Sequence, residues 1–306
     1  MLSFSELEVF YHALVVKARD RGVACAITSG LACVAFGVSE TTKDCDLLCA
    51  PAAADIMLGL LQETSLRGHW PSYRGHLSPP LDARWLGGGW TSHFVWGGSG
   101  GEAYLDVFGV APRGTTPWEA ELLGCYAGLH TVAEMKRTNR ERDWPFATAL
   151  GLKLLASGDP RGWLHLFNHD VLLQTADRLD CPRDMLALRP VLHLLVAGDE
   201  RLEVALRGEV EFWRQLDALR IKLYERALRP YFLAVRGDSR SAAAGLHAQH
   251  AVRVEHAEHL LPARPLADYG LPRLLAEARE RAARLVPVGA LDWLPDVSPS
   301  FIQVAT

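Results

Sequence analysis

The hydrophobic pattern of this chain changes character near residue 145, and that change sets the fold class. Before this point, apolar runs with the two-residue period of strands alternate with segments of helical period. Beyond it only helical periodicity is present, in five segments. We therefore predict an α+β fold with two domains: residues 1–145 form a mixed β-sheet with flanking helices, and residues 146–306 form an all-helical C-terminal domain.

Local signals predict the elements of the first half. Ser3 and Glu6 form a capping box, so we expect a helix from about Ser5 to Ala18. The glycine run at 97–101 indicates the turn of a β-hairpin. Closing that hairpin would place residues near Ser92 opposite Asp106. Ser92 and His93 could therefore border a site, or their position could be a coincidence. We expect the other strands at 23–28 and 43–49, with short helices at 31–36 and 52–62.

Further along, Thr131 and Glu134 have the spacing of a second capping box, at the start of a helix that carries Lys136. The five helical segments of the second half are expected at about 145–156, 162–178, 184–197, 200–234 and 271–285. The Ala- and His-rich stretch at 237–259 is expected to be a loop or a weak helix.

Composition excludes several classes of protein. The chain has 306 residues, 49% hydrophobic and 22% charged, which excludes long disorder and fibrous repeats. A net charge of −4 argues against a protein devoted to coating nucleic acid, although it allows a local basic groove. The N-terminus lacks the basic region of a signal peptide, and no apolar run is long enough for a membrane span. We expect a cytoplasmic protein without a membrane partner.

Four of the six cysteines lie between Cys25 and Cys49, which raises the question of a zinc site. Their spacing matches no zinc template. We expect them to be free thiols that pack as small buried hydrophobic residues.

The strongest chemical signal is a pair of acids in the predicted strand 43–49. Because strand side chains alternate between faces, Asp44 and Asp46 lie on one side, and Cys45, Leu47 and Cys49 lie on the other. Two like charges on one face favour a cation between them, and carboxylate oxygens suit Mg²⁺. The alternative is an exposed edge strand whose acids are solvated.

Two further features favour a site. Asp106 is a third acid within an apolar strand, where aspartate is disfavoured. Ser29-Gly30 joins a predicted strand to a short helix, a place where backbone N–H groups can hold a phosphate.

These residues together resemble the DNA polymerase beta-like nucleotidyltransferase superfamily, above all its small bacterial, toxin-like members. Those members read strand, paired small residues, short helix, Gly, and then Arg-x-Thr-x-Asp-x-Asp. The matching positions here are Ser29-Gly30, Gly37, Thr42, Asp44 and Asp46.

The resemblance covers about residues 5–155. Asp106 matches the third carboxylate by placement, and residues 135–143 resemble the Lys…Arg-x-Lys-Asp run that follows the catalytic core. Two positions depart from the pattern: Glu40 replaces the usual Arg of the turn, and Ser29 replaces the first glycine.

The resemblance implies a nucleotidyltransferase-type sheet and a Mg²⁺-dependent transfer of NMP from an NTP, such as ATP, to an acceptor hydroxyl, with release of pyrophosphate. Asp44 and Asp46 would hold two Mg²⁺ ions, and Asp106 would join the ion that activates the acceptor hydroxyl. The residues implied for nucleotide binding are Ser29, Gly30, Thr42, Lys136 and Arg140.

The acceptor stays open between an RNA end, a protein and a small molecule, as do the preferred base and the oligomeric state. Toxin-like members modify tRNA or protein, which allows a cognate protein partner. A second hypothesis is a nucleotide-binding or protein-interaction module whose active site has decayed. Glu40 and Ser29 support it, and the three intact acids oppose it.

Two other patterns have simpler interpretations. His165 and His169 are four residues apart, but without further ligands we expect packed or solvated helix positions. Arginines and acids alternate along residues 201–229, and we expect a solvated helix face with salt bridges.

Overall fold

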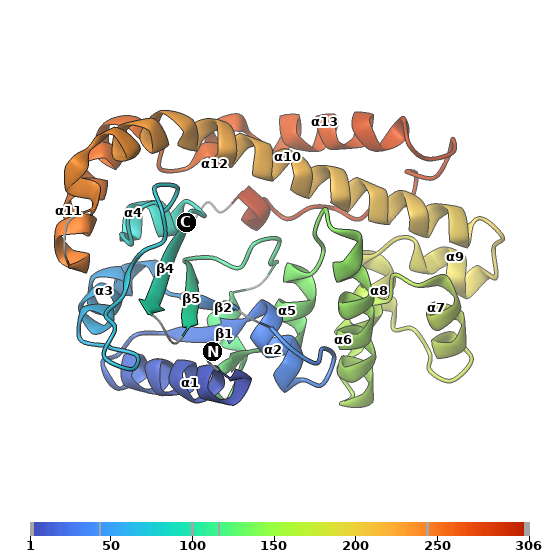
Figure 1. Cartoon of the computed structure of the whole chain (residues 1–306). Helices are drawn as coiled ribbons and strands as arrows, with labels where there is room; N and C mark the ends of the chain where they lie inside the picture. The colour runs from blue at the N-terminus through green and yellow to red at the C-terminus, as the bar shows by residue number, and fades with distance from the viewer. Residues whose placement is uncertain (1–2, 43, 99–100, 116, 243–244, 303–306) are drawn as a thin grey trace.

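The fold is α+β, with one seven-stranded mixed sheet and a helical C-terminal region (Figure 1). The computed structural model describes residues 3–302 except 43, 99–100, 116 and 243–244. The order of the strands across the sheet is β3-β4-β5-β2-β1-β7-β6. Their bounds are β1 Cys25–Thr28, β2 Asp44–Cys49, β3 Ser72–Tyr73, β4 Thr91–Gly98, β5 Gly101–Phe108, β6 Leu122–Leu123 and β7 Tyr126–Ala127.

The centre of the sheet combines both strand directions. β2 pairs antiparallel with β1 and parallel with β5, while β4 and β5 form the predicted hairpin. In the parallel pair Asp46 is the partner of Asp106, and in the hairpin His93 is the partner of Asp106. This register brings three polar residues from separate strands to one point.

Five helices accompany the sheet, with bounds α1 Phe4–Asp20, α2 Ser29–Ala35, α3 Ala54–Gln62, α4 Ala83–Gly87 and α5 Leu129–Met135. The capping box at Ser3 and Glu6 is confirmed, since each side chain bonds the other residue's backbone. Cys45 and Cys49 are buried in the core, and all six cysteines are free, as predicted. The short elements α4 and β3 were not predicted.

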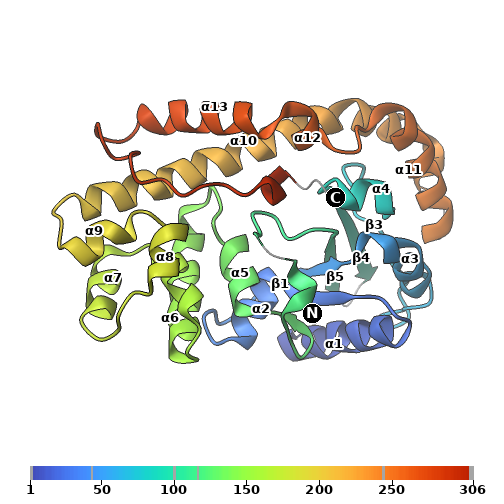
Figure 2. The same ribbon diagram turned by 180° about the vertical axis from the view of Figure 1, so that it is seen from behind.

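The C-terminal region contains helices α6 Trp144–Ala156, α7 His169–Ala176, α8 Arg183–Leu188, α9 Leu192–Ala197, α10 Leu202–Gly237, α11 Leu246–Leu260, α12 Pro265–Tyr269 and α13 Leu271–Ala283. Figure 2 shows α10 running along the whole length of the molecule, with α13 beside it. At its far end the chain turns into α11, which lies next to β3. The Ala- and His-rich stretch is thus largely a packed helix.

Three predictions about helices were wrong. Thr131 and Glu134 form no capping box, because α5 begins at Leu129, with Gly128 as its N-cap, and both side chains are buried. The expected helix 162–178 is divided into a 3₁₀ turn at Pro160–His165 and α7. The expected helix 184–197 is divided into α8 and α9, because a proline at position 190 disfavours helical conformation in the residue before it.

The sheet and the C-terminal helices share hydrophobic contacts. One buried cluster joins Trp85 and Trp90 of the first half to Tyr231 and Val235 of α10 and to residues of α11. The division into domains at residue 145 stays a prediction. Within the described part of the chain, no helix is both long enough and apolar enough to cross a membrane.

A buried ion pair fixes α10 against the shorter helices. Arg189 and Glu209 are each only 2% exposed, and Arg189 Nη2 lies 2.8 Å from Glu209 Oε2. Arg189 Nη1 also donates to the carbonyl oxygens of Trp163 and Leu166. Removing one partner would leave the other charge buried without compensation.

We predict that Glu209→Ala lowers the free energy of unfolding by about 3–5 kcal/mol, the cost of an unpaired buried charge. The matched control is Glu280→Ala, which breaks the exposed pair with Arg284 and should cost about 0.5 kcal/mol or less. Urea denaturation followed by circular dichroism measures both. Equal losses in the two variants would contradict the prediction.

Candidate functional site

All eight residues predicted for the site line one cavity of about 820 Å³. They come from β2, β5, the start of α2, the turn between α2 and β2, and the segment between α5 and α6, and α10 forms part of the wall. These residues are Ser29, Gly30, Thr42, Asp44, Asp46, Asp106, Lys136 and Arg140.

The acids lie on the cavity side of the sheet. Alternation along β2 exposes Asp44, half-buries Asp46 and buries Cys45 between them, as predicted. Asp106 has the same orientation on β5, where its neighbours Leu105 and Val107 are buried. The third acid therefore does not point into the core.

The junction of β1 and α2 has an unusual backbone. Ser29 has a φ of 54°, a left-handed conformation that a serine rarely adopts. Its side chain hydrogen-bonds the Asp46 carboxyl. A Cβ added to Gly30 would lie 2.5 Å from Thr42 Oγ1, so only glycine allows the two segments to approach this closely.

The charge of Asp46 is costly in this position. Burial, followed by the negative charge of Asp106, raises the pKa of Asp46 to about 6. The Ser29 hydrogen bond and the Lys136 charge act in the opposite direction without cancelling the effect. A cation bound to the Asp46 carboxylate would relieve this cost.

Asp106 is already compensated. Arg74 Nη2 donates to both of its carboxylate oxygens, at 2.7 and 3.0 Å, and His93 Nδ1 lies 2.8 Å from Oδ1. The β-hairpin thus brings His93 to the site, and Ser92 faces the core instead.

The donor set fits one Mg²⁺ ion better than two. Asp44 and Asp46 offer carboxylate oxygens on one face of β2, and the raised pKa of Asp46 marks an uncompensated charge. In the described residues, no group of three or more His, Cys, Asp or Glu side chains has a geometry suited to a metal. Arg74 already occupies both oxygens of Asp106, whereas the carboxyl of Asp46 hydrogen-bonds Ser29.

Part of the cavity wall is basic, and we call it the basic wall. It carries Arg113, Lys136, Arg140, Arg142 and Arg220. Asp143, at the start of α6, holds two of them: Arg140 Nη2 lies 2.7 Å from Oδ2, and Lys136 Nζ lies 3.7 Å from Oδ1. A cavity lined by both acids and cations suits a metal-bound polyphosphate.

Asp217 organises the part of this wall that α10 supplies. The side chain is buried and accepts hydrogen bonds from Arg113 at 2.6 Å, Arg220 at 3.0 Å and the backbone of Asn139 at 2.9 Å. The prediction that the charged residues of α10 form a solvated face is wrong here. Asp217 and Arg220 belong to the cavity, while Arg201 pairs near the surface with Asp199.

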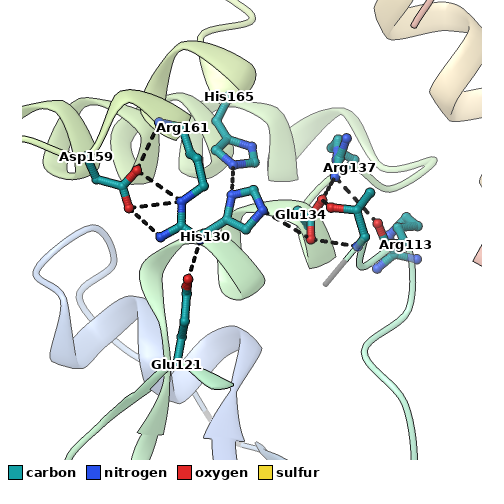
Figure 3. A network of polar contacts seen from close by, with 9 residues as sticks. Arg113, Glu121, His130, Glu134, Arg137, Asp159, Arg161 and His165 are labelled. Atoms are coloured by element: carbon teal, nitrogen blue, oxygen red, sulfur yellow. Dashed lines mark hydrogen bonds and ion pairs between the residues drawn. The ribbon is translucent and has the colours of Figure 1, made fainter. Parts of the chain in front are cut away.

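A second polar network connects α5 to the segments around it (Figure 3). His130 Nδ1 lies 2.9 Å from His165 Nε2, and Glu134 binds Arg137 at 2.5 Å and Thr115 at 2.6 Å. His165 is fully buried, and burial lowers the pKa of both histidines. This pair is therefore a packed structural contact, and His169 lies on a different helix.

Sequence reasoning missed three residues that shape the site: Arg74, Arg113 and Asp217. It named His93 as a residue that could border the site and left the question open. Arg74 and Arg113 lie in segments without periodicity, so no local pattern singles them out. The hairpin register was the signal for His93, and a mid-helix aspartate within an apolar stripe was the signal for Asp217.

Comparison with known proteins identifies no relative of this chain. No family model matches the chain, and no curated protein or solved structure matches it either.

Proposed function

We propose that this chain is a Mg²⁺-dependent nucleotidyltransferase, which transfers NMP from an NTP to an acceptor hydroxyl and releases pyrophosphate. The observation that carries the proposal is the convergence of eight residues, chosen from sequence alone, on one cavity. The same cavity is lined by the acids of β2 and β5 and by arginine and lysine side chains.

Each residue has a defined task in this proposal. Asp44 and Asp46 hold Mg²⁺, which when bound neutralises charge on the phosphates during in-line displacement. The Ser29 hydroxyl and the Gly30 amide bind terminal phosphate oxygens. Thr42 packs against Gly30 and sets the shape of the turn around them.

Lys136 and Arg140 complete the phosphate site. Asp143 holds both near the cavity, and the Lys136 ammonium lies 5.5 Å from the centre of the Phe146 ring. Arg220 adds a cation from α10, so the helical region contributes directly to nucleotide binding. The acceptor, whether an RNA end, a protein or a small molecule, stays open.

The competing hypothesis is a decayed module that binds nucleotide without transferring it. The raised pKa of Asp46 favours an active site, because strongly shifted pKa values are typical of functional sites. A decayed module would gain nothing from a half-buried acid that destabilises the fold. The Glu40 and Ser29 departures favour the decayed module. Transfer of label distinguishes the two hypotheses.

We predict that Asp44→Ala/Asp46→Ala abolishes transfer, with a loss of at least about 10³-fold, since removal of the metal ligands removes the charge stabilisation of the reaction. The measurement incubates the protein with each α-labelled NTP, Mg²⁺ and a cell extract. The matched control is Asp177→Ala/Asp180→Ala, which removes two exposed acids outside the cavity and should keep full activity. Transfer that survives the first double substitution would refute the metal-site assignment. Nucleotide binding without transfer by the wild-type protein would support the decayed module.

We also predict a specific pH dependence for Asp46. Because its folded pKa is raised, the carboxyl destabilises the metal-free fold increasingly as the pH rises from about 4 through about 6. Asp46→Asn should therefore stabilise the metal-free protein at pH 7.5 by about 1 kcal/mol, after allowance for the solvent that reaches this half-buried group.

The check is thermal unfolding in EDTA at pH 4.5 and pH 7.5. The difference between Asp46→Asn and the wild type should be clearly larger at the higher pH. In the wild type, Mg²⁺ affinity should fall as the pH drops below about 6, because protons compete for the carboxylate. An equal difference in stability at both pH values would contradict the shifted pKa.

A further inference from the structure

A second cavity, of about 330 Å³, shares Arg113 with the cavity of the proposed site, which we call the nucleotide cavity. Its wall is formed by the segment around residue 114, the ends of α5 and α8, part of α10, and the C-terminal residues 295–299 and 301. Its size suits a small ligand, because sites for organic molecules span about 300–1,000 Å³. The proposed function gives this second cavity no task.

Three N–H donors of the residues that line the second cavity have no hydrogen-bond partner within the described part of the chain. They are Arg113 Nε, Arg137 Nε and Trp213 Nε1. The three side chains are 7%, 7% and 3% exposed. A buried donor without an acceptor is costly, above all when it belongs to a charged group. Three such donors around one cavity point to a ligand that accepts hydrogen bonds.

The other contacts of these side chains hold them in place. Arg113 Nη1 donates to Asp217 Oδ1 at 2.6 Å, and Arg137 Nη2 donates to Glu134 Oε1 at 2.5 Å. The Arg137 guanidinium also lies 4.8 Å from the centre of the Trp213 ring. The two guanidinium groups are therefore fixed at their Nη ends, and each keeps an Nε–H without an acceptor.

The kind of donor selects the kind of ligand. All three unpartnered groups donate and two belong to guanidinium groups, so an anion that only accepts hydrogen bonds fits better than water, which must also donate. A phosphate has enough oxygens to serve three donors from separate side chains, whereas a carboxylate has two. The buried charges of the lining have an excess of one positive charge: Arg113, Arg137, Arg189, Glu134 and Glu209. A third acid of the lining, Asp296, is exposed.

We propose that the second cavity binds a phosphate-type oxyanion, which accepts hydrogen bonds from Arg113, Arg137 and Trp213. This inference goes beyond the proposed function, because such a site needs neither Mg²⁺ nor a nucleotide. Arg113 also belongs to the basic wall, so the bound anion would contact a residue of the nucleotide cavity.

Equilibrium dialysis of the full-length protein against radiolabelled inorganic phosphate, without nucleotide or divalent metal, tests the site. Trp213→Phe removes one donor and keeps an aromatic ring beside Arg137, and Arg137→Lys keeps the charge and removes the Nε donor. We expect each variant to weaken phosphate binding about tenfold, the effect of one hydrogen bond to a charged group. The matched control is Trp144→Phe, which should leave the affinity unchanged. Trp144 is also buried with an unpartnered Nε1 among the described residues, but it lines a different cavity.

Arg140→Gln tests whether phosphate binds in the nucleotide cavity instead. Arg140 lines that cavity, so a loss of affinity in Arg140→Gln with none in Trp213→Phe and Arg137→Lys would overturn the inference. A wild-type protein that binds no phosphate, because water alone fills the second cavity, would overturn it as well. Circular dichroism confirms that each variant folds. Both results would leave the proposed function intact, since transfer of label from an NTP is measured separately.

Discussion

The parallel pairing of β2 with β5 is the constraint on which the rest of the site depends. It places Asp46 beside Asp106 on one face of the sheet, where two carboxylates in a half-buried setting repel each other. The two carboxylates differ in how far neighbouring groups compensate their charge. Arg74 compensates Asp106 through direct hydrogen bonds, while Asp46 keeps a pKa raised to about 6. β2 pairs with a strand on each side, so its acids do not lie on a solvated edge strand.

The basic wall shows a second use of paired charge. Asp143 and Asp217 are both buried, and each holds basic side chains of the cavity wall in position. Burying an ion pair gives little net stability, but it fixes the direction of long side chains that would otherwise move freely in solvent. A ligand that arrives with several phosphate charges would then meet cations that are already oriented.

The sequence predicted the fold class, the hairpin and the alternation of β2 because these depend on local periodicity. The eight candidate residues came from the alternation of the acids along their strands and from the resemblance to a known family, and in the structure they line one cavity. The sequence did not predict Arg74 or Asp217, whose roles arise from contacts between distant segments. The false capping box at Thr131 has a similar cause: α5 is buried, and Glu134 finds its partner in Arg137 instead of the helix start.

The position of α11 affects the segment that carries Arg74, far from it in the sequence. Gln249 accepts the Tyr73 backbone N–H at 3.0 Å, His250 contacts the Tyr73 hydroxyl at 2.8 Å, and Arg253 donates to the Gly75 carbonyl at 2.9 Å. These three bonds bracket Arg74 on both sides. A chain that ended before α11 would keep every acid of the site and yet lose the brace that aligns its arginine. Residues near 250 therefore affect the charge around Asp106 by holding the segment that carries Arg74, although they do not line the cavity.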